Sequence, residues 1–335
     1  MTTTNDKNGD LMLDVRDLTI HYETDSGVVH AVEGLNLQLG RGESLGFVGE
    51  TGAGKTTTAL GIMRLIPNPP GRIKSGEILF EGENLLSKSE AEMRHIRGAK
   101  IAMIFQDPMT SLNPVMTVDK QIAEMIRLHR RVSEAEALSQ AGDMLELVGI
   151  RRERMHDYPH QFSGGMKQRV VIAIALACDP TLLIADEPTT ALDVTIQAQV
   201  LELMKQLKQK FAASMILITH DLGIVADICD KVAIMYAGRV VEYADKRALY
   251  ATPLHPYTIG LFNSVPDIDE DIDELPVIPG LMPDPMALPA GCTFHPRCSM
   301  AEESCSTVRP EMQELEPGHF VACRFAGRLT RSRSS

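Results

Sequence analysis

Apolar and polar residues alternate through the first part of the chain in the manner of half-buried strands. The alternation runs from Leu11 to Tyr22 and again from Val28 to Leu39, with Gly27 between them as a turn residue. Shorter apolar runs predict further strands at residues 45–48, 101–105, 182–185 and 215–219, and a hairpin arm at residues 76–84. The pattern therefore predicts a fold with a large sheet component.

Apolar residues at helical spacing predict helices between these strands. We expect them at residues 57–65, 133–148, 169–178 and 196–207, with a capping box formed by Ser133 and Glu136. Residues 106–114 are polar and contain two prolines, so we expect no regular structure there. A helical middle between strand-rich flanks predicts an α/β core with a helical lobe inserted at about residues 107–165.

The stretch Gly49-Glu50-Thr51-Gly52-Ala53-Gly54-Lys55-Thr56, followed by Thr57, fits the phosphate-binding loop pattern at every fixed position. It lies between a predicted strand and a predicted helix, the context in which backbone N–H groups and a helix N-terminus face a phosphate. Lys55 would reach the β- and γ-phosphates, and the Thr56 hydroxyl would ligate Mg²⁺. An ordinary glycine-rich turn is the alternative, but the flanking elements favour nucleoside triphosphate binding.

Two carboxylates follow the apolar run at residues 182–185. Asp186 ends a predicted buried strand, where it would hold Mg²⁺ directly or through water. Glu187 comes next and would accept a proton from the attacking water. A solvated acidic turn is the alternative, which the phosphate loop makes less attractive. From residues alone, the chain is an ATP-hydrolysing α/β protein.

Composition limits the other functions that the chain could have. Its 335 residues allow one large domain with an appendage or two modest domains, and 44% hydrophobic residues suffice for a sizeable core. The formal net charge of −12 argues against a general nucleic-acid coat. The first ten residues lack the apolar core of a signal peptide, and no apolar run approaches the ~20 residues of a membrane helix. We therefore expect a soluble cytosolic chain.

Further motifs follow the phosphate loop in a fixed order. They are Gln106 after a strand, Ser163-Gly164-Gly165, the carboxylate pair, Ala191-Leu192-Asp193 and His220. Together, over residues 11–241, they resemble the ATP-binding subunit of an ATP-binding-cassette (ABC) transporter. The resemblance implies a P-loop NTPase fold of the ABC type with an antiparallel β subdomain and an inserted helical lobe. It places the ATPase domain at residues 1–250 and a small cysteine-containing extension at residues 251–335.

The resemblance also implies roles for residues in the chain's own nucleotide site. Tyr22 matches the aromatic residue that stacks on adenine, although an ordinary strand aromatic remains the alternative reading of this position. Gln106 matches the loop that senses Mg²⁺ and the membrane partner, so Mg²⁺ would be held by Thr56, Gln106 and Asp186. His220 matches the histidine that contacts the γ-phosphate and holds the attacking water beside Glu187, whereas alone it would be a structural residue.

Other motif residues are implied to act on a partner's nucleotide. In this family two nucleotide-binding domains form a head-to-tail sandwich, and the signature segment of each closes over ATP held by the other. The implied residues are Ser163, Gly164, Gly165, Met166 and Asp193. The usual fifth signature residue is Gln, which here stands at Gln168 rather than at position 166, so backbone contacts are expected there and not a glutamine side-chain contact.

A finer resemblance comes from residues 106–114, 163–169 and 254–258. They are similar to the oligopeptide/dipeptide permease ATPases, and the Ser-Gly-Gly-Met form resembles the first, D-type, of the two non-identical ATPase subunits in such systems. This implies a heterodimeric ATPase partner, two transmembrane permease subunits and an extracytoplasmic substrate-binding protein. The chain would lie peripherally on the cytoplasmic face of the membrane and energise an importer. Another solute, such as nickel or a sugar, remains an alternative.

Four of the six cysteines lie close together near the C-terminus, after an acidic and proline-rich connector. Cys292, Cys298, Cys305 and Cys323 are separated by five, six and 17 residues, which is not the paired spacing of common zinc sites. Spacing alone leaves metal or cluster binding and scattered thiols equally open, with His295 as a competing ligand. The peptide-permease ATPases carry a similar cysteine set that holds a [4Fe–4S] cluster, so the resemblance implies such a cluster with a structural role.

Two rival classes share the nucleotide motifs. DNA-maintenance ATPases insert a long coiled coil between the two motifs, whereas here the interval is about 130 residues without sustained heptads. Ribosome-associated ATPases of this kind have two cassettes in one chain, and this sequence has one phosphate loop. Both readings are therefore less well supported than a transporter subunit.

Overall fold

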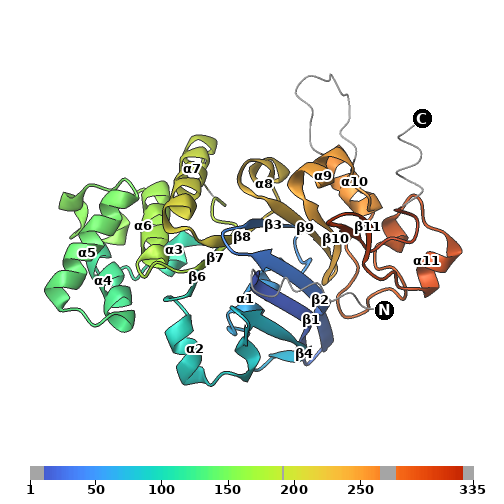
Figure 1. Ribbon diagram of the computed structural model, residues 1–335, viewed down its shortest axis with the longest axis horizontal. Helices are drawn as coiled ribbons and strands as arrows, with labels where there is room; N and C mark the ends of the chain where they lie inside the picture. The colour runs from blue at the N-terminus through green and yellow to red at the C-terminus, as the bar shows by residue number, and fades with distance from the viewer. Residues whose placement is uncertain (1–10, 191, 265–276, 327–335) are drawn as a thin grey trace. The chain divides into compact units, whose positions relative to one another are not determined.

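The computed structural model describes residues 11–190, 192–264 and 277–326 (Figure 1). The described residues fall into two compact units. The first takes its described residues from 11–12, 39–44, 87–190 and 192–218, and the second from 13–38, 45–86, 219–264 and 277–326. Each unit therefore combines segments that are distant in the sequence, and each is described separately below.

The first unit has three parallel strands that are buried along almost their whole length. They are β6 (Ile101–Ile104), β7 (Leu182–Asp186) and β8 (Ser214–Thr219), with β7 paired to both others. Such strands are covered on both faces, which explains why they appear in the sequence as continuous apolar runs rather than alternating ones. The strands predicted at residues 101–105, 182–185 and 215–219 are thereby confirmed.

Helices make up most of the rest of the first unit. They are α2 (Glu90–Ile96), α3 (Pro108–Ser111), α4 (Val118–His129), α5 (Glu134–Leu147), α6 (Gly164–Leu176) and α7 (Val194–Phe211). Helices α4, α5 and α6 contact one another (Figure 1). The Ser133 side chain caps α5 and Glu136 bonds back to the Ser133 N–H, so the predicted capping box is confirmed.

One expectation about this unit was wrong. Residues 106–114 are not wholly irregular, because α3 begins at Pro108. A proline is tolerated in the first turn of a helix, where its missing N–H would have had no partner within the helix. Proline therefore marked the start of a short helix here, not the absence of one.

The second unit contains two sheets. In one, the strand order is β2 (Gly27–Gly40), β1 (Leu11–Thr24), β4 (Gly71–Phe80) and β5 (Glu83–Asn84). Strand β4 runs antiparallel to both β1 and β5. The other has the order β11 (Gln313–Glu316), β12 (His319–Val321), β10 (Arg239–Asp245), β9 (Lys231–Tyr236) and β3 (Ser44–Val48), with β3 parallel to β9.

The helices of the second unit are short. They are α1 (Lys55–Ile62), α8 (Leu222–Ile228), α9 (Lys246–Ala251), α10 (Pro256–Asn263) and α11 (Glu303–Thr307). Helix α1 follows β3 directly after the phosphate loop, as predicted, although it begins two residues before the expected position. In the described part of the chain, no helix has the length and apolar character needed to cross a membrane.

A buried carboxylate ties the C-terminal residues to the sheet of the second unit. Glu242 on β10 is fully buried and accepts hydrogen bonds from the Leu254 and His255 backbone N–H groups, at 2.7 and 2.8 Å. The same carboxylate lies 2.8 Å from Nε2 of His319 on β12. Burial lowers the pKa of His255 to about 4, while nearby Glu242 acts in the opposite direction. This network fixes the extension within the second unit.

Candidate functional site

The phosphate loop lies between the fully buried strand β3 and helix α1, in the second unit. Gly54 ends it with a φ of 104°, a left-handed conformation that favours glycine. The Lys55 side chain is buried, and its Nζ donates hydrogen bonds to the carbonyls of Gly49 (2.7 Å) and Glu50 (3.0 Å). The ammonium group is thus held over the backbone of the loop, where an anionic phosphate would find it.

The loop is tightly packed against other backbone of its unit. A Cβ atom added to Gly49 would lie 2.2 Å from the Met235 carbonyl oxygen, and one added to Gly54 would lie 2.4 Å from that of Ala31. The Gly238 N–H donates to the Ala53 carbonyl at 2.9 Å. These glycines are therefore required by close approach as well as by the turn, which explains why the motif tolerates no side chain at either position.

The C-terminal extension contacts the phosphate loop through Glu50. The Glu50 N–H donates to the Tyr257 hydroxyl at 3.0 Å. One guanidinium nitrogen of Arg297 lies 3.1 and 3.0 Å from the two Glu50 carboxylate oxygens. Only 6% of the Arg297 side chain is exposed. Arg297 is not among the residues predicted from the sequence, although its place between two of the clustered cysteines was a signal.

Tyr22 lies in the same unit, on β1, opposite Gly71 of β4. Its ring is close enough that a Cβ on Gly71 would lie 2.8 Å from Tyr22 Cε1. The side chain is half-buried, so part of the ring remains exposed. Its proposed stacking on adenine remains a prediction.

The carboxylate pair lies in the first unit, at the end of β7. Asp186 is the last residue of that strand and is 2% exposed. Glu187 follows with a φ of 44°, which is uncommon for a residue other than glycine and costs energy. Such strained positions concentrate at functional sites, so the geometry supports a functional interpretation of this turn.

Two side chains hold the Glu187 carboxylate. Gln106, just after β6, donates from Nε2 to Glu187 Oε2 at 3.0 Å, and the Thr190 hydroxyl donates to the same oxygen at 3.0 Å. The structure therefore brings Gln106 and Glu187 together although 81 residues separate them. Thr190 is not among the residues predicted from the sequence, although it lies only three residues after Glu187.

The signature segment lies at the start of α6, also in the first unit. The Ser163 side chain accepts a hydrogen bond from the Met166 N–H (3.4 Å), and Ser163 and Gly164 are exposed. Gly165 is buried, and a Cβ there would lie 2.3 Å from Cγ2 of Ile196 on α7. Two exposed residues thus stand at a helix N-terminus, where free N–H groups suit an anion.

Asp193 and His220 complete the predicted motif residues. Asp193 is exposed, and its carboxylate caps α7 by accepting from the Ile196 N–H at 3.0 Å. Its motif neighbour Ala191 lies outside the described residues. His220 is exposed in the second unit, directly after β8. The second unit thus carries Tyr22, the phosphate loop and His220, and the first carries the other nucleotide motifs.

The four clustered cysteines line one cavity in the second unit. Aromatic and apolar side chains, among them Phe294, Phe325 and Met300, line it with them. Burial raises the pKa of the Cys292, Cys298 and Cys323 thiols, the last to about 11. A hydrogen bond from the backbone N–H two residues further along the chain lowers each of these three pKa values, against the effect of burial. His295, considered above as a competing ligand, directs its Nδ1 to the Cys292 carbonyl at 2.9 Å.

Comparison with known families matches two parts of the chain. Residues 32–190 match the family described as ABC transporter. Residues 241–305 match the family described as the C-terminal region of the oligopeptide/dipeptide transporter. The first match contains the phosphate loop, the signature segment and the carboxylate pair, and the second contains three of the four clustered cysteines together with Arg297.

Relatives match almost the whole chain. A probable peptide ABC transporter ATP-binding protein of Sinorhizobium fredii is 53% identical over 317 residues, covering 94% of this chain and 95% of the relative. The oligopeptide transport ATP-binding protein OppD of Bacillus subtilis is 52% identical, covering 92% and 87%. The Escherichia coli protein of the same name is 50% identical, covering 94% and 93%.

A solved structure of similar fold is the ATP-binding cassette MJ0796, dimeric and in a post-hydrolysis state with ADP and Pi. It is 26% identical, with a TM-score of 0.64, and covers 70% of this chain and 99% of that one. The predicted α/β fold of the ABC type is therefore confirmed. On these identities and coverages, the chain belongs to the ABC transporter family, among the ATP-binding proteins of peptide transporters.

Proposed function

We propose that this chain is the ATP-hydrolysing subunit of a membrane importer for oligopeptides or dipeptides. One observation carries the proposal: relatives named for peptide transport align over more than nine-tenths of the chain, from the phosphate loop into the cysteine-bearing extension. An ATPase from a transporter for an unrelated solute would need to resemble these relatives only in the ATPase domain, and not in the C-terminal extension. The chain would act at the cytoplasmic face of the membrane, with a second ATPase subunit, two permease subunits and an extracytoplasmic binding protein.

The second unit supplies the groups for binding ATP. Lys55, already aligned over the Gly49 and Glu50 carbonyls, would exchange these contacts for β- and γ-phosphate oxygens. The loop N–H groups and the N-terminus of α1 add partial positive charge. Tyr22 would stack on adenine, and His220 would contact the γ-phosphate. The remaining phosphate-loop residues in this proposal are Thr51, Gly52, Ala53, Gly54, Thr56 and Thr57.

The first unit supplies the groups for hydrolysis. Glu187 would accept a proton from the attacking water, with its carboxylate oriented by Gln106 and Thr190. Gln106 and Asp186 offer an amide and a carboxylate oxygen, and Thr56 of the second unit offers a hydroxyl, a donor set that suits Mg²⁺. When bound, Mg²⁺ would neutralise charge on the phosphate oxygens. Since Gln106 uses Nε2 to bond Glu187, its Oε1 is the atom that would face a metal.

The signature residues would serve the partner's nucleotide. Ser163 and Gly164 are exposed at the start of α6, and Asp193 is exposed at the start of α7. Exposed N–H groups at a helix start can approach a γ-phosphate held by another chain. The Met166 sulfur accepts a hydrogen bond from an Arg154 guanidinium nitrogen at 3.5 Å. Because the side chain is held in this way, Met166 would offer its backbone and not its side chain to the partner's nucleotide. Ser163→Arg should therefore impair hydrolysis at the partner's site while leaving this chain's own ATP affinity nearly unchanged.

The four cysteines fit a [4Fe–4S] cluster by their chemistry. Four thiols line one largely apolar cavity, and backbone N–H hydrogen bonds lower the pKa of three of them against the effect of burial. Such N–H groups stabilise thiolates, the form that binds iron. A cluster would supply cross-linking to an extension with little core of its own. Cys292, Cys298, Cys305 and Cys323 would be the four ligands.

The cluster can be tested on anaerobically purified protein. We expect a brown chain with about four irons and matching sulfide, and a colourless Cys298→Ser variant. Cys178→Ser is the matched control, because that half-buried thiol lies in the first unit. Zinc without iron would replace the cluster by a single ion on the same ligands. Absence of any metal would exclude both.

The transport role can be tested in proteoliposomes that contain this chain with its copurifying membrane subunits. Uptake of labelled di- to pentapeptides should require ATP and the binding protein, and should stop with Lys55→Ala. Stimulation of ATPase activity by nickel or a sugar but not by peptides would overturn the solute class. Copurification with ribosomes or DNA instead of membrane proteins would overturn the transport role itself.

A further inference from the structure

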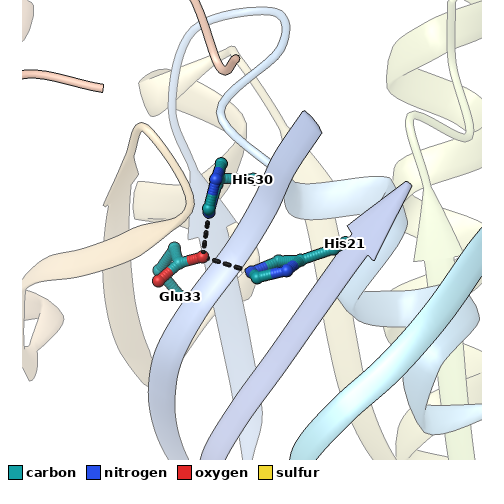
Figure 2. A group of neighbouring side chains, drawn as sticks. All are labelled: His21, His30 and Glu33. Atoms are coloured by element: carbon teal, nitrogen blue, oxygen red, sulfur yellow. Dashed lines mark hydrogen bonds and ion pairs between the residues drawn. The ribbon is translucent and has the colours of Figure 1, made fainter. Parts of the chain in front are cut away.

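A second group of candidate metal ligands lies on the antiparallel sheet of the second unit. His21 on β1 and His30 and Glu33 on β2 direct their side chains toward one point (Figure 2). Glu33 Oε1 lies 2.5 Å from His21 Nε2 and 2.7 Å from His30 Nδ1. Within the described residues, this is the one group of three His, Cys, Asp or Glu ligand atoms that all lie within 4.8 Å of one another.

We propose that His21, His30 and Glu33 bind a divalent transition-metal ion of the zinc class. Two imidazole nitrogens and one carboxylate oxygen form an established zinc ligand set, with a fourth position open to water. Imidazole ligands favour Zn²⁺, Co²⁺, Ni²⁺ or Cu²⁺ over Mg²⁺ and Ca²⁺, so this site is chemically distinct from the Mg²⁺ ligands proposed above. The two imidazoles have different nitrogens facing the carboxylate, and either nitrogen can bind a metal.

The geometry is close to what a metal would require. With metal–ligand distances of about 2.0–2.2 Å, ligand atoms in a tetrahedral site stand roughly 3.3 Å apart. Each nitrogen would therefore move away from Glu33 Oε1 by less than about 1 Å. The imidazole rings already meet edge to face, with centroids 4.4 Å apart and an interplanar angle of 61°.

Exposure and charge also bear on the site. The side chains of His21, Glu33 and His30 are 14%, 18% and 36% exposed, so an ion would enter past His30. The other Glu33 oxygen lies 3.6 Å from a guanidinium nitrogen of Arg239. Because that cation offsets part of the carboxylate charge, we expect moderate affinity and coordination through one oxygen only.

The site has a defined connection to the phosphate loop. The Glu33 N–H donates to the Gly238 carbonyl, and the Gly238 N–H donates to the Ala53 carbonyl, both at 2.9 Å. The Ala31 carbonyl is the atom against which Gly54 packs. His21 precedes Tyr22. A metal that bridges β1 and β2 would restrict all of these segments, so, if the proposed ATP site is correct, metal binding should tighten ATP binding by several-fold.

Cobalt is the probe that separates this site from the cysteines. Thiolate ligands give Co²⁺ a strong charge-transfer band in the near ultraviolet, whereas nitrogen and oxygen ligands give only d–d bands. In difference spectra against the same chelator-treated, cluster-loaded chain without Co²⁺, one Co²⁺ should bind with d–d bands alone, and Zn²⁺ should displace it. Glu33→Gln and His30→Gln should weaken binding at least about tenfold. His30→Gln is the variant least expected to disturb folding, because His30 is the most exposed ligand.

Glu23→Gln is the matched control, since Glu23 lies on β1 but pairs with Lys74 at 2.8 Å. Its Co²⁺ affinity should equal that of the wild type.

Absence of Co²⁺ binding, or binding by Glu33→Gln and His30→Gln as tight as that of the wild type, would overturn the site. So would a thiolate band alone. If Zn²⁺ still changes ATP affinity in Glu33→Gln, the effect would come from Zn²⁺ bound to ATP itself. That result would overturn the proposed coupling between the metal site and ATP binding. None of the metal measurements requires transport, so they can fail independently of the proposed function.

A second inference rests on the contact between Arg297 and Glu50. Arg297 ends a 3₁₀ turn (His295–Arg297) between two cysteines. Its Nε donates to the Pro279 carbonyl at 2.8 Å. Its guanidinium carbon also lies 5.8 Å from the Tyr236 ring centroid. These contacts fix the guanidinium group that bonds Glu50. We infer that Arg297 is a positioning residue through which the cysteine-bearing turn holds the phosphate loop.

This inference, which rests on the proposed ATP site, predicts an effect on binding and not on chemistry. Arg297→Ala should raise KM for ATP by about 5- to 30-fold and leave kcat within about twofold, because a charged hydrogen bond at a buried site is lost. Arg297→Lys should restore part of the loss. Arg309→Ala is the control, since Arg309 is exposed in the same extension.

Removing iron should raise KM in the wild type and add little in Arg297→Ala. Binding of a fluorescent ATP analogue to the isolated chain gives the readout that does not depend on turnover. Wild-type affinity in Arg297→Ala, while Lys55→Ala loses binding, would overturn the inference. Failure of the wild type to bind ATP would instead overturn the proposed function.

Discussion

The phosphate loop of the second unit and the carboxylate turn of the first are stabilised in different ways. The loop is held by backbone packing so close that Gly49 and Gly54 leave no room for a Cβ, and by the extension through Glu50. The Glu187 carboxylate is held by two side-chain hydrogen bonds, from Gln106 and Thr190, both of which are exposed. The first arrangement is rigid, whereas the second can be rearranged by a rotation about side-chain bonds.

This difference matches what the two regions are proposed to do. A phosphate site must be preorganised, because N–H groups and an ammonium ion are useful only if they already point inward. A general base must reach its proton only when the water is in place, and it can be held apart until then. If this is correct, variants in the second unit should change ATP affinity, and variants around Glu187 should change turnover.

The largest effect is expected at Glu187. Glu187→Gln should lower hydrolysis at this chain's own nucleotide site by about 10²- to 10⁴-fold, the usual contribution of a general base, while the partner subunit's site keeps its own base. The amide keeps the size of the side chain, so ATP affinity should remain within about threefold of wild type. Wild-type release by the assembled transporter would show that Glu187 is not the base and would break the comparison.

Lys55 should give the opposite result. Lys55→Ala removes charged hydrogen bonds to phosphate and should lower ATP affinity by about 10- to 100-fold. Equilibrium binding of a fluorescent analogue to the isolated chain measures this without the partner. Lys74→Ala, an exposed lysine of the same unit, serves as the control. Unchanged affinity would contradict the assignment of the loop as the ATP site.

A substitution at Thr190 should have the smallest effect on turnover. It is also the most specific test of the difference between the carboxylate turn and the phosphate loop. Thr190→Val removes one hydrogen bond to Glu187 and should lower turnover by about 3- to 10-fold, with unchanged ATP affinity. Thr195→Val, at an exposed position of α7, should leave both quantities unchanged. A loss of ATP affinity in Thr190→Val, with turnover intact, would mean that this turn serves binding after all.

The sequence predicted features that depend on local spacing. The phosphate loop, the strand ending in Asp186 and the capping box at Ser133 each lie within a few residues, so their geometry follows from the order of residue types. The same reasoning misjudged residues 106–114, because a proline is compatible with a helix start as well as with a loop.

Contacts between distant segments could not be predicted in this way. Arg297 meets Glu50 across 247 residues, and Glu242 meets His319 across 77. His21 and Glu33 are closer in sequence, yet their meeting depends on how β1 and β2 pair. No periodicity reports such pairings, since each depends on the register and packing of whole elements.

The most direct test of this account is the nucleotide retained by the assembled transporter that carries Glu187→Gln. The complex is incubated with Mg²⁺ and labelled ATP, freed of unbound nucleotide, and its bound label is identified by chromatography, beside Lys55→Ala and the wild type. The account predicts that this chain's site retains intact ATP in Glu187→Gln, loses its label in Lys55→Ala and holds mainly ADP in the wild type, with the label at the partner subunit's site common to all three. The same ADP yield in Glu187→Gln as in the wild type, or as much bound label in Lys55→Ala as in Glu187→Gln, would contradict the division of binding and hydrolysis between the two regions.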